Sequence, residues 1–212
     1  VYFNHSSQTS GASGLIFSPD GKKLFIVSDS SNKVWEYHLP VAYDLSTMYH
    51  ATEPSYGILV SSQDSGPNGI AFNADGTKMF IVGMSTDKIY RYSTGGVSWI
   101  RSASGWLQPD DIAASDYFGE YVAISDDGKT VTAASRQWSS KKGKIYIWQK
   151  ASDGSWQQMG DNIQASNAGT DDQFGRGLSI SGDGGTILSG ANQEDTTAGD
   201  AGSAYVFITT HD

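Results

Sequence analysis

Short apolar segments alternate with polar turns along the whole chain, and the same arrangement occurs four times. Each copy has a short apolar segment, an Asp-Gly pair, a second apolar segment, a polar loop and a third segment with alternating aromatic residues. The turn aspartates are Asp20, Asp75, Asp127 and Asp183, so successive copies are 55, 52 and 56 residues apart. A fixed period of this size is typical of repeat architectures such as solenoids, propellers and arrays.

The segments of each copy predict antiparallel β-strands. Asp-Gly between two apolar segments is a strong signal for a hairpin turn, because Gly tolerates positive φ and Asp bonds to its own backbone. Apolar and polar residues alternate with period two in the third segments, which indicates strands there as well. The predicted third strands are 33–37, 88–92, 144–148 and 203–207, and less regular fourth strands are expected at 56–61, 98–102 and 156–163.

Four antiparallel strands per unit form the blade of a β-propeller. We therefore predict an all-β fold, a single β-propeller domain over residues 1–212 with four blades. Its units are about 14–61, 69–107, 118–165 and 174–212 plus 1–8. The fourth unit lacks a fourth strand, so residues 1–8 are predicted to complete it and close the ring, which removes exposed edges. The alternative is a larger ring completed by another chain or by further sequence.

Two repeat families resemble these units. Phe17–Lys22 and Phe72–Thr77 resemble the Ser-Pro-Asp-Gly repeats of TolB-like and lactonase-like propellers. Phe118-Gly119 with Ser125–Gly128, and Phe174-Gly175 with Ser181–Gly184, resemble FG-GAP-type repeats. The resemblance implies a propeller of a bacterial surface, phage or other extracellular assembly. FG-GAP units often carry a calcium loop, but these turns lack its alternating carboxylates, so that role is not carried over to them.

Composition narrows the classes of partner. The 212 residues carry a net charge of −9, which argues against binding nucleic acid or an anionic membrane by bulk electrostatics. No apolar run is long enough to span a bilayer, so no membrane insertion is expected. Cysteine is absent, so disulfides and thiolate chemistry are excluded. We expect an extracellular, cell-surface or virion-surface location.

Non-repeated polar loops carry the candidate binding residues. Trp138 lies between Arg136 and two lysines in a loop without a counterpart in the other units, and such a Trp can stack on a sugar or anchor a protein partner. The alternative is that Trp138 folds back over the rim. The predicted ligand-binding residues are Arg136, Trp138, Lys141, Lys142, Asp171, Asp172, Gln173 and Arg176.

Acidic residues in loops of one face suggest a cation site. The candidate ligands are Asp171, Asp172, Asp195 and Asp200, and Ca²⁺ is the ion that carboxylate oxygens favour. The alternative is a solvated acidic rim. No other cofactor is expected.

The inner strands favour a non-catalytic function. They are read as 15–17, 70–72, 121–124 and 178–180, and they offer apolar and small side chains instead of titratable groups. We therefore predict a binding or structural module, not an enzyme, that presents loops to a glycan or protein and that forms a homo-oligomer or part of a larger assembly. The alternatives are a lactonase-like metal-dependent hydrolase and a passive spacer in a longer fibre.

Overall fold

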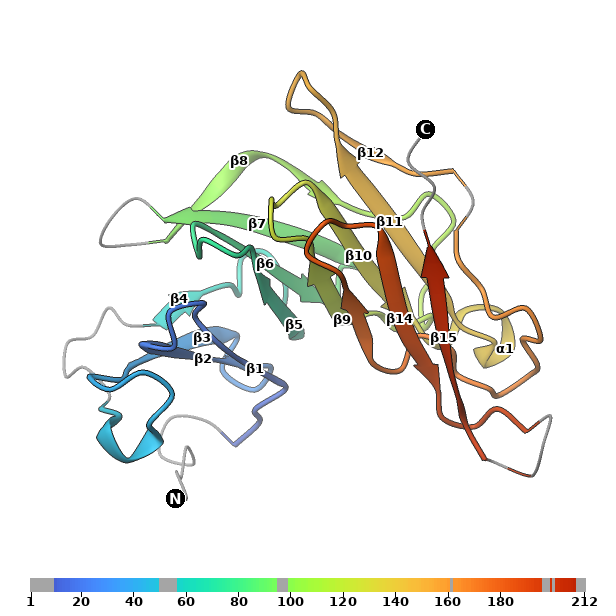
Figure 1. Ribbon diagram of the computed structural model, residues 1–212, viewed down its shortest axis with the longest axis horizontal. Coiled ribbons are helices and arrows are strands. Elements are labelled where there is room, and N and C mark those ends of the chain that lie inside the picture. The colour runs from blue at the N-terminus through green and yellow to red at the C-terminus, as the bar shows by residue number, and fades with distance from the viewer. Residues whose placement is uncertain are drawn as a thin grey trace.

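The computed structural model describes residues 10–49, 57–94, 99–160, 162–195, 199 and 201–208, which form four antiparallel sheets (Figure 1). The first contains β1 (Gly14–Phe17), β2 (Lys23–Ser28), β3 (Lys33–His38) and β4 (Gly57–Leu59). The second contains β5 (Pro67–Phe72), β6 (Lys78–Gly83), β7 (Lys88–Thr94) and β8 (Trp99–Leu107). The third contains β9 (Phe118–Ile124), β10 (Thr130–Ser135), β11 (Lys144–Lys150) and β12 (Trp156–Gln158). The fourth contains β13 (Leu178–Ile180), β14 (Thr186–Ala191) and β15 (Ser203–Ile208). Two single turns, η1 (Leu45–Thr47) and α1 (Trp138–Lys141), are the helical elements of the described chain.

The predicted all-β propeller fold with four blades is confirmed. Each sheet is one blade, and its strands follow one another in chain order, with β1, β5, β9 and β13 as the inner strands. β5 packs against both β1 and β9, and β9 packs against β13. The first and fourth blades therefore lie at opposite ends of an arc of blades (Figure 1). The predicted closing strand, residues 1–8, lies outside the described residues and stays a prediction.

The Asp-Gly turns have the structural role that the sequence predicts. Asp20 Oδ1 accepts a hydrogen bond from Lys22 N at 3.0 Å, and the other three turn aspartates bond to the residue two positions later in the same way. The following glycines have positive φ, from 67° at Gly21 to 76° at Gly184. Each turn therefore combines side-chain acceptance by Asp with the left-handed conformation that Gly tolerates.

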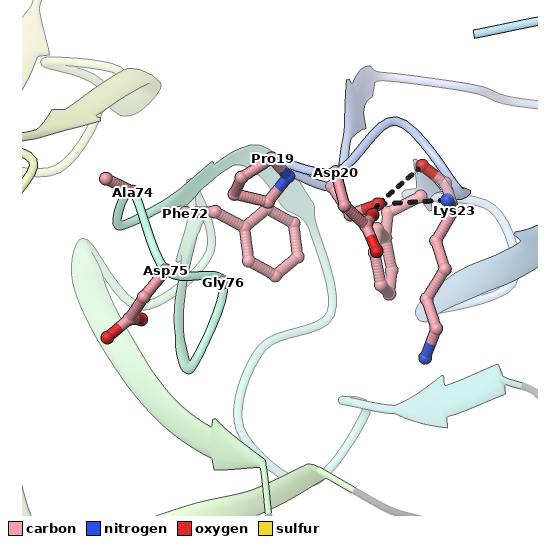
Figure 2. A pocket seen from close by; sticks show the side chains of 9 residues that line it. Pro19, Asp20, Lys23, Phe72, Ala74, Asp75 and Gly76 are labelled. Atoms are coloured by element: carbon pink, nitrogen blue, oxygen red, sulfur yellow. Dashed lines mark hydrogen bonds between the residues drawn. The ribbon is translucent and has the colours of Figure 1, made fainter. Parts of the chain in front are cut away.

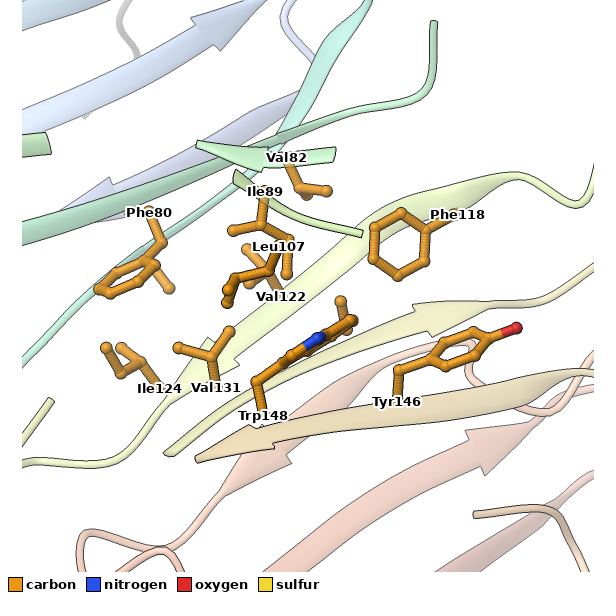
Figure 3. Packing of buried hydrophobic residues seen from close by; sticks show 12 residues of the cluster. Phe80, Val82, Ile89, Leu107, Phe118, Val122, Ile124, Val131, Tyr146 and Trp148 are labelled. Carbon is orange, nitrogen blue, oxygen red and sulfur yellow. The ribbon is translucent and has the colours of Figure 1, made fainter. Parts of the chain in front are cut away.

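Hydrophobic side chains fill the joints between neighbouring blades. Phe80, Val82 and Ile89 of the second blade form one cluster with Val131, Trp148 and other residues of the third (Figure 3). The repeated aromatics of the third strands belong to these joints: Tyr90 lies between the first and second blades, Tyr146 between the second and third, and Tyr205 between the third and fourth. Their repetition therefore reflects packing.

A Phe-Gly pair fixes the start of the third blade and the entry to the fourth. Phe118 and Phe174 are completely buried. Gly119 and Gly175 follow them with φ of 93° and 99°, and a Cβ on Gly175 would lie 2.9 Å from the Cβ of Ala134. Glycine is needed at both positions because of the positive φ and the close approach of side chains from the preceding blade, Val82 at Gly119 and Ala134 at Gly175.

Candidate functional site

Two loops that the sequence singles out lie side by side between the third and fourth blades. Lys141 O accepts a hydrogen bond of 2.7 Å from Gln173 N, and Lys142 O accepts one of 3.2 Å from Phe174 N. A third bond of 3.2 Å runs from Asp171 N to Ser140 O. The loop after β10 and the loop before β13 are thus joined by a short backbone ladder, which gives their side chains fixed relative positions.

Backbone conformations of high energy concentrate around this ladder. Ten described non-glycine residues have positive φ, and seven of them are Ser115, Tyr117, Ser139, Ser140, Lys141, Asp171 and Gln173. All seven lie in three loops: the loop before β9, the loop between β10 and β11, and the loop before β13. Residues in the left-handed region cost free energy, and they cluster at binding and catalytic sites, where the surrounding structure holds them in place.

The side chains of these loops form what we call the arginine cluster: Glu120, Arg136, Gln173 and Arg176. Gln173 Oε1 accepts hydrogen bonds from Arg136 Nη1 at 3.0 Å and from Arg176 Nη1 at 3.1 Å. Arg136 Nε also donates to Glu120 Oε2 on β9. The guanidinium of Arg136 lies 5.2 Å from the ring centre of Tyr117. The cluster therefore brings three predicted residues together with Glu120, which the prediction missed, and Tyr117, also missed, lies beside it.

Charge in the arginine cluster is not balanced. Glu120 neutralises Arg136, and both side chains are mostly buried, with 20% and 18% of their surface exposed. Arg176 is exposed and makes no ion pair with a carboxylate in the described part of the chain. Nearby Lys141 is paired with Asp171 at 2.7 Å. The cluster thus carries a net positive charge in a protein whose overall charge is −9, which suits an anionic ligand.

Trp138 is half-buried, so it is neither fully exposed to a ligand nor fully folded back over the rim. Nζ of Lys144 lies 4.5 Å from the ring centre of Trp138. The same ammonium donates to Asp111 Oδ2. Partial burial of Asp111 opposes ionisation, but the hydrogen bond and the charge of Lys144 outweigh it and lower the pKa of that carboxyl. Trp138 therefore packs on one side against the buried ammonium of a half-exposed ion pair. Lys142, the remaining predicted basic residue, is half-buried in the same loop.

The acidic residues predicted to bind calcium do not form a metal site in the described chain. No group of three His, Cys, Asp or Glu side chains there could hold a metal ion. Asp172 is buried and accepts a hydrogen bond of 2.6 Å from Gly169 N. Asp195 is exposed, and Asp200 lies outside the described residues. Asp171 is thus engaged with Lys141 and Asp172 with the backbone of its own loop, and the calcium prediction gains no support.

A cavity of about 490 Å³ lies elsewhere, between the Asp-Gly turns of the first two blades (Figure 2). Turns of later blades are joined by hydrogen bonds from Ala74 N to Asp126 O at 3.2 Å and from Asp126 N to Gly182 O at 2.9 Å. Pro19 occupies the corresponding position in the first blade and has no N–H to donate. The cavity therefore follows from a missing hydrogen bond. Its lining offers one lysine, Lys23, which is paired with Glu36.

The prediction missed Glu120 for a simple reason. It began the third inner strand at residue 121, whereas β9 begins at Phe118. A strand that starts at the Phe-Gly pair contains Glu120, a titratable residue on an inner strand.

No helix of the described chain has the length and apolar character needed to cross a membrane.

Comparison with known proteins supports the architecture. Residues 104–148 and 156–207 match the FG-GAP repeat family. A proposed 6-phosphogluconolactonase from Bacteroides fragilis superposes with a TM-score of 0.64 at 15% identity, over 93% of this chain and 55% of that one. A second, from Bacteroides uniformis, gives 0.62 at 16% identity over 92% and 54%. The periplasmic gluconolactonase of Pseudomonas aeruginosa gives 0.54 at 17% identity over 87% and 48%.

The chain therefore spans about half the length of these proteins. A search of curated protein sequences finds no match. The predicted resemblance to a propeller of lactonase-like and FG-GAP-type repeats is confirmed.

The prediction that the chain is not an enzyme is wrong. Solved structures with the same architecture carry the names of lactonases, so this fold does not exclude catalysis. The argument from apolar inner strands fails physically as well. It overlooked Glu120 on β9, a titratable side chain on an inner strand.

Proposed function

We propose, for this β-propeller repeat protein with FG-GAP repeats in its second half, that the arginine cluster binds an acidic or phosphorylated sugar lactone and hydrolyses it. The single observation that carries the proposal is the pairing of two guanidinium groups, Arg136 and Arg176, on the side-chain oxygen of Gln173, next to the carboxylate of Glu120. The structural likeness to lactonases supports the choice of reaction.

Arg176 is the residue that recognises the anionic group of the ligand. It is exposed, and Gln173 holds one of its nitrogens, so the guanidinium is positioned while N–H groups are left for a ligand. A planar guanidinium binds carboxylate or phosphate through two parallel hydrogen bonds, which fixes both position and orientation. Arg136 cannot take this role to the same extent, because Glu120 already occupies its Nε.

Glu120 is the general base in this proposal. Its Oε2 accepts from Arg136, whereas its Oε1 makes no hydrogen bond with the described residues. Oε1 takes a proton from water as the water oxygen forms a bond to the lactone carbonyl carbon. The ring C–O bond then breaks, and Glu120 returns the proton to the oxygen that leaves. This use of a positioned carboxylate is general base catalysis.

The loops that carry the cluster also suit a site that must be held rigidly. The backbone ladder from Ser140 to Phe174 and the left-handed residues around it fix Gln173, and Gln173 in turn fixes both arginines. Preorganised donors stabilise a transition state without reorganisation during the reaction. The FG-GAP match supports the predicted location outside the cell.

Hydrolysis of gluconolactone, with and without a 6-phosphate, tests the proposal. The rate of acid release with the protein is compared with the rate of spontaneous hydrolysis without it. Glu120→Gln is expected to lower kcat by about 10²-fold or more, since a positioned base contributes 10²–10⁴-fold. Arg176→Met is expected to raise KM about tenfold or more, because a charged hydrogen bond contributes about 1.5–3 kcal/mol. Arg101→Met, an exposed arginine on β8, is the matched control.

A hydrolysis rate with the wild-type protein that is no higher than the spontaneous rate would overturn the proposal. Equal losses in Arg176→Met and Arg101→Met would also overturn it, because the effect would then come from general charge and not from the cluster. Binding of a glycan or protein at these loops without lactone hydrolysis would instead favour the earlier prediction of a glycan or protein partner over the lactone.

A further inference from the structure

The cavity between the first two Asp-Gly turns is large enough for a ligand. Its volume of about 490 Å³ lies within the roughly 300–1,000 Å³ of typical small-molecule sites. It lies at the opposite end of the strands from the arginine cluster, because an Asp-Gly turn precedes the second strand of a blade and the loop of Arg136 follows that strand. The proposed lactone hydrolysis therefore does not account for this cavity.

Two phenylalanines from neighbouring blades form the apolar wall of the cavity. The ring centres of Phe25 on β2 and Phe72 at the end of β5 lie 4.8 Å apart. Phe25 is buried, whereas Phe72 is half-buried and Pro19 is exposed. Figure 2 shows the Phe72 ring and Pro19 between the two turn aspartates, Asp20 and Asp75. A flat ligand group can stack on such an aromatic surface.

Negative charge predominates around this wall. Asp20 and Asp75 use Oδ1 for their turn hydrogen bonds, and Oδ2 of each makes no hydrogen bond or ion pair with the described residues. A hydroxyl group two residues away donates to each carboxylate and lowers its pKa, so both are ionised at neutral pH. Lys23 is the one cationic residue of the lining, and Glu36 pairs with it at 2.6 Å.

Pro19 also leaves a backbone acceptor without the partner that later turns provide. In those turns, the residue before Asp donates its N–H to the matching carbonyl of the next blade. The matching carbonyl for Pro19 is that of Ala74, which accepts no hydrogen bond from the described residues, because proline has no N–H. The lining therefore contains a carbonyl oxygen and two carboxylate oxygens to which a ligand with N–H groups can bond.

Tyr43 holds the first turn in place beside the cavity. Its hydroxyl donates to Pro19 O at 3.0 Å, and its backbone N–H donates to Gly21 O at 2.9 Å. Tyr43 has a φ of 61°, a conformation that is unfavourable for a large side chain. Such strain persists only where surrounding contacts hold it, and it is found at ligand sites. The first-blade wall of the cavity is therefore fixed before any ligand binds.

We propose that this cavity binds an alkylguanidinium group, either of a free small molecule or of an arginine side chain in a protein. The flat guanidinium stacks on the Phe72 ring, and its N–H groups bond to the open acceptors of the two turns. A guanidinium suits the cavity better than an ammonium, because it is planar, more weakly hydrated and able to stack on an aromatic face. This inference does not depend on lactone hydrolysis, since no residue of the arginine cluster lines the cavity.

Titration followed by NMR of the backbone amides tests the proposal, with agmatine and N-acetyl-arginine methylamide as probes. Saturable shifts are expected at the amides of Gly21, Ala74 and Gly76, in about 150 mM NaCl, which screens weak attraction between exposed charges. N-acetyl-lysine methylamide should bind about tenfold or more weakly, because its ammonium cannot stack. Equal affinity for the two guanidinium probes indicates a free small molecule as ligand, and tighter binding of the blocked arginine indicates a protein partner.

Pro19→Ala tests the origin of the cavity. It supplies the N–H that the later turns use, so the first two turns should join and binding should weaken about tenfold or more. Pro40→Ala changes an exposed proline outside the lining and should bind as the wild type does. Asp75→Asn removes the charge but keeps an oxygen for the turn, and it should also weaken binding about tenfold or more. Asp183→Asn makes the same change in the fourth blade and should leave binding unchanged.

Wild-type protein without saturable shifts would overturn the proposal, and so would a Pro19→Ala variant that binds as tightly as the wild type. A circular dichroism melt checks that each variant is folded. Equal losses in Asp75→Asn and Asp183→Asn would overturn it as well, because general charge would then set the affinity. Shifts that spread to Gly128 and Gly184 in the later turns, or a lysine probe that binds as tightly as the arginine probe, would show non-specific attraction of cations to an acidic protein.

Discussion

Nζ of Lys144 donates a hydrogen bond of 2.5 Å to Oδ2 of Asp111, next to the loop that contains Trp138. Only 7% of the Lys144 side chain is exposed, whereas 47% of the Asp111 side chain is exposed. The ammonium also faces the rings of Trp138 and Tyr146, at 4.5 and 5.1 Å. The lysine is thus nearly buried and has a single carboxylate partner, so its charge depends on that partner.

Asp111→Ala should therefore destabilise the protein more than Lys144→Met does. Removing Asp111 leaves a buried ammonium unpaired, and we expect a loss of about 1–2 kcal/mol after allowance for the exposure of the carboxylate. That loss lowers Tm by about 2–8 °C, since 1 kcal/mol shifts a domain of this size by about 2–4 °C. The double variant should match Lys144→Met alone. An equal loss from each single change, with full additivity, would contradict the pairing.

The Asp111 pair also sets a pH dependence. The folded-state pKa of Asp111 is lowered, against the effect of its partial burial, by the hydrogen bond and charge of Lys144. A lowered carboxyl pKa adds stability above the unfolded value of about 3.9, and this stability is lost as the pH falls through the folded value. The difference in Tm between wild type and Asp111→Ala should therefore be full at pH 7 and should narrow below about pH 4. Thermal melts across that range measure it.

Asp87→Asn is expected to raise Tm at neutral pH, whereas Asp111→Ala lowers it. Partial burial raises the pKa of Asp87, and the charges of Asp116 and Asp64 raise it further. The folded state therefore disfavours the ionised form, so stability is lost as the pH rises from the unfolded pKa through the folded one. Asn removes the charge and also suits the φ of 54° at this position. We expect Tm to rise at pH 7 by about 1–3 °C, and the gain to shrink in acid.

Asp153→Asn is the matched control for this effect. The hydroxyl and the backbone N–H of Ser155 lower the pKa of Asp153, so its ionised form is favoured in the fold. The same chemical change should then reduce Tm at pH 7. A rise in both variants would mean that loss of negative charge in general, and not the surroundings of Asp87, sets the result.

Local sequence signals are sufficient to predict the blades. Asp-Gly turns and period-two alternation act within a few residues, so the hairpins around Asp20 and Asp75 follow from the sequence alone. Strand ends depend on more than alternation. β9 begins at Phe118, three residues before the expected start, because the Phe-Gly pair continues the strand where the alternation of apolar residues has already ended.

The site could be predicted only in part, because it depends on tertiary contacts. The loops of Arg136 and Arg176 were selected for their composition, and the structure places them side by side. What the sequence could not reveal is that Gln173 joins the two arginines and that Glu120 pairs with one of them. The difference in exposure between Leu15 and Ile70, 68% against 8%, is also invisible in sequence, since both are apolar residues at one repeat position and differ only in what covers them.

Glycine at the Phe-Gly pair should be far less replaceable than glycine in a free turn. Gly119→Ala places a side chain at φ 93° and against Val82 Cγ2, so both conformational strain and a clash arise. Gly154→Ala has a similar φ of 85° but no atom within 4 Å of the new Cβ. We expect about 1–2 kcal/mol for Gly154→Ala and about 2–5 kcal/mol for Gly119→Ala, measured by urea unfolding. Equal losses would show that the strand can move away from Val82.

Asp64 is expected to be the polar residue whose loss is most costly in the first two blades. It is 3% exposed and accepts hydrogen bonds from Gly66 N at 2.7 Å and from Thr86 N at 2.9 Å, as well as from the Thr86 hydroxyl. It thereby joins the loop before β5 to the turn between β6 and β7. Asp64→Ala leaves these half-buried donors unpaired, which should cost about 2–4 kcal/mol. Thr86→Val is the control, since it removes only the hydroxyl and should cost about 1 kcal/mol.

Hydrogen exchange provides the local readout: the amides of Gly66 and Thr86 should lose protection in Asp64→Ala while those of β10 keep it. Unchanged protection at both amides would mean that water replaces the carboxylate and that the two loops are held together by other contacts.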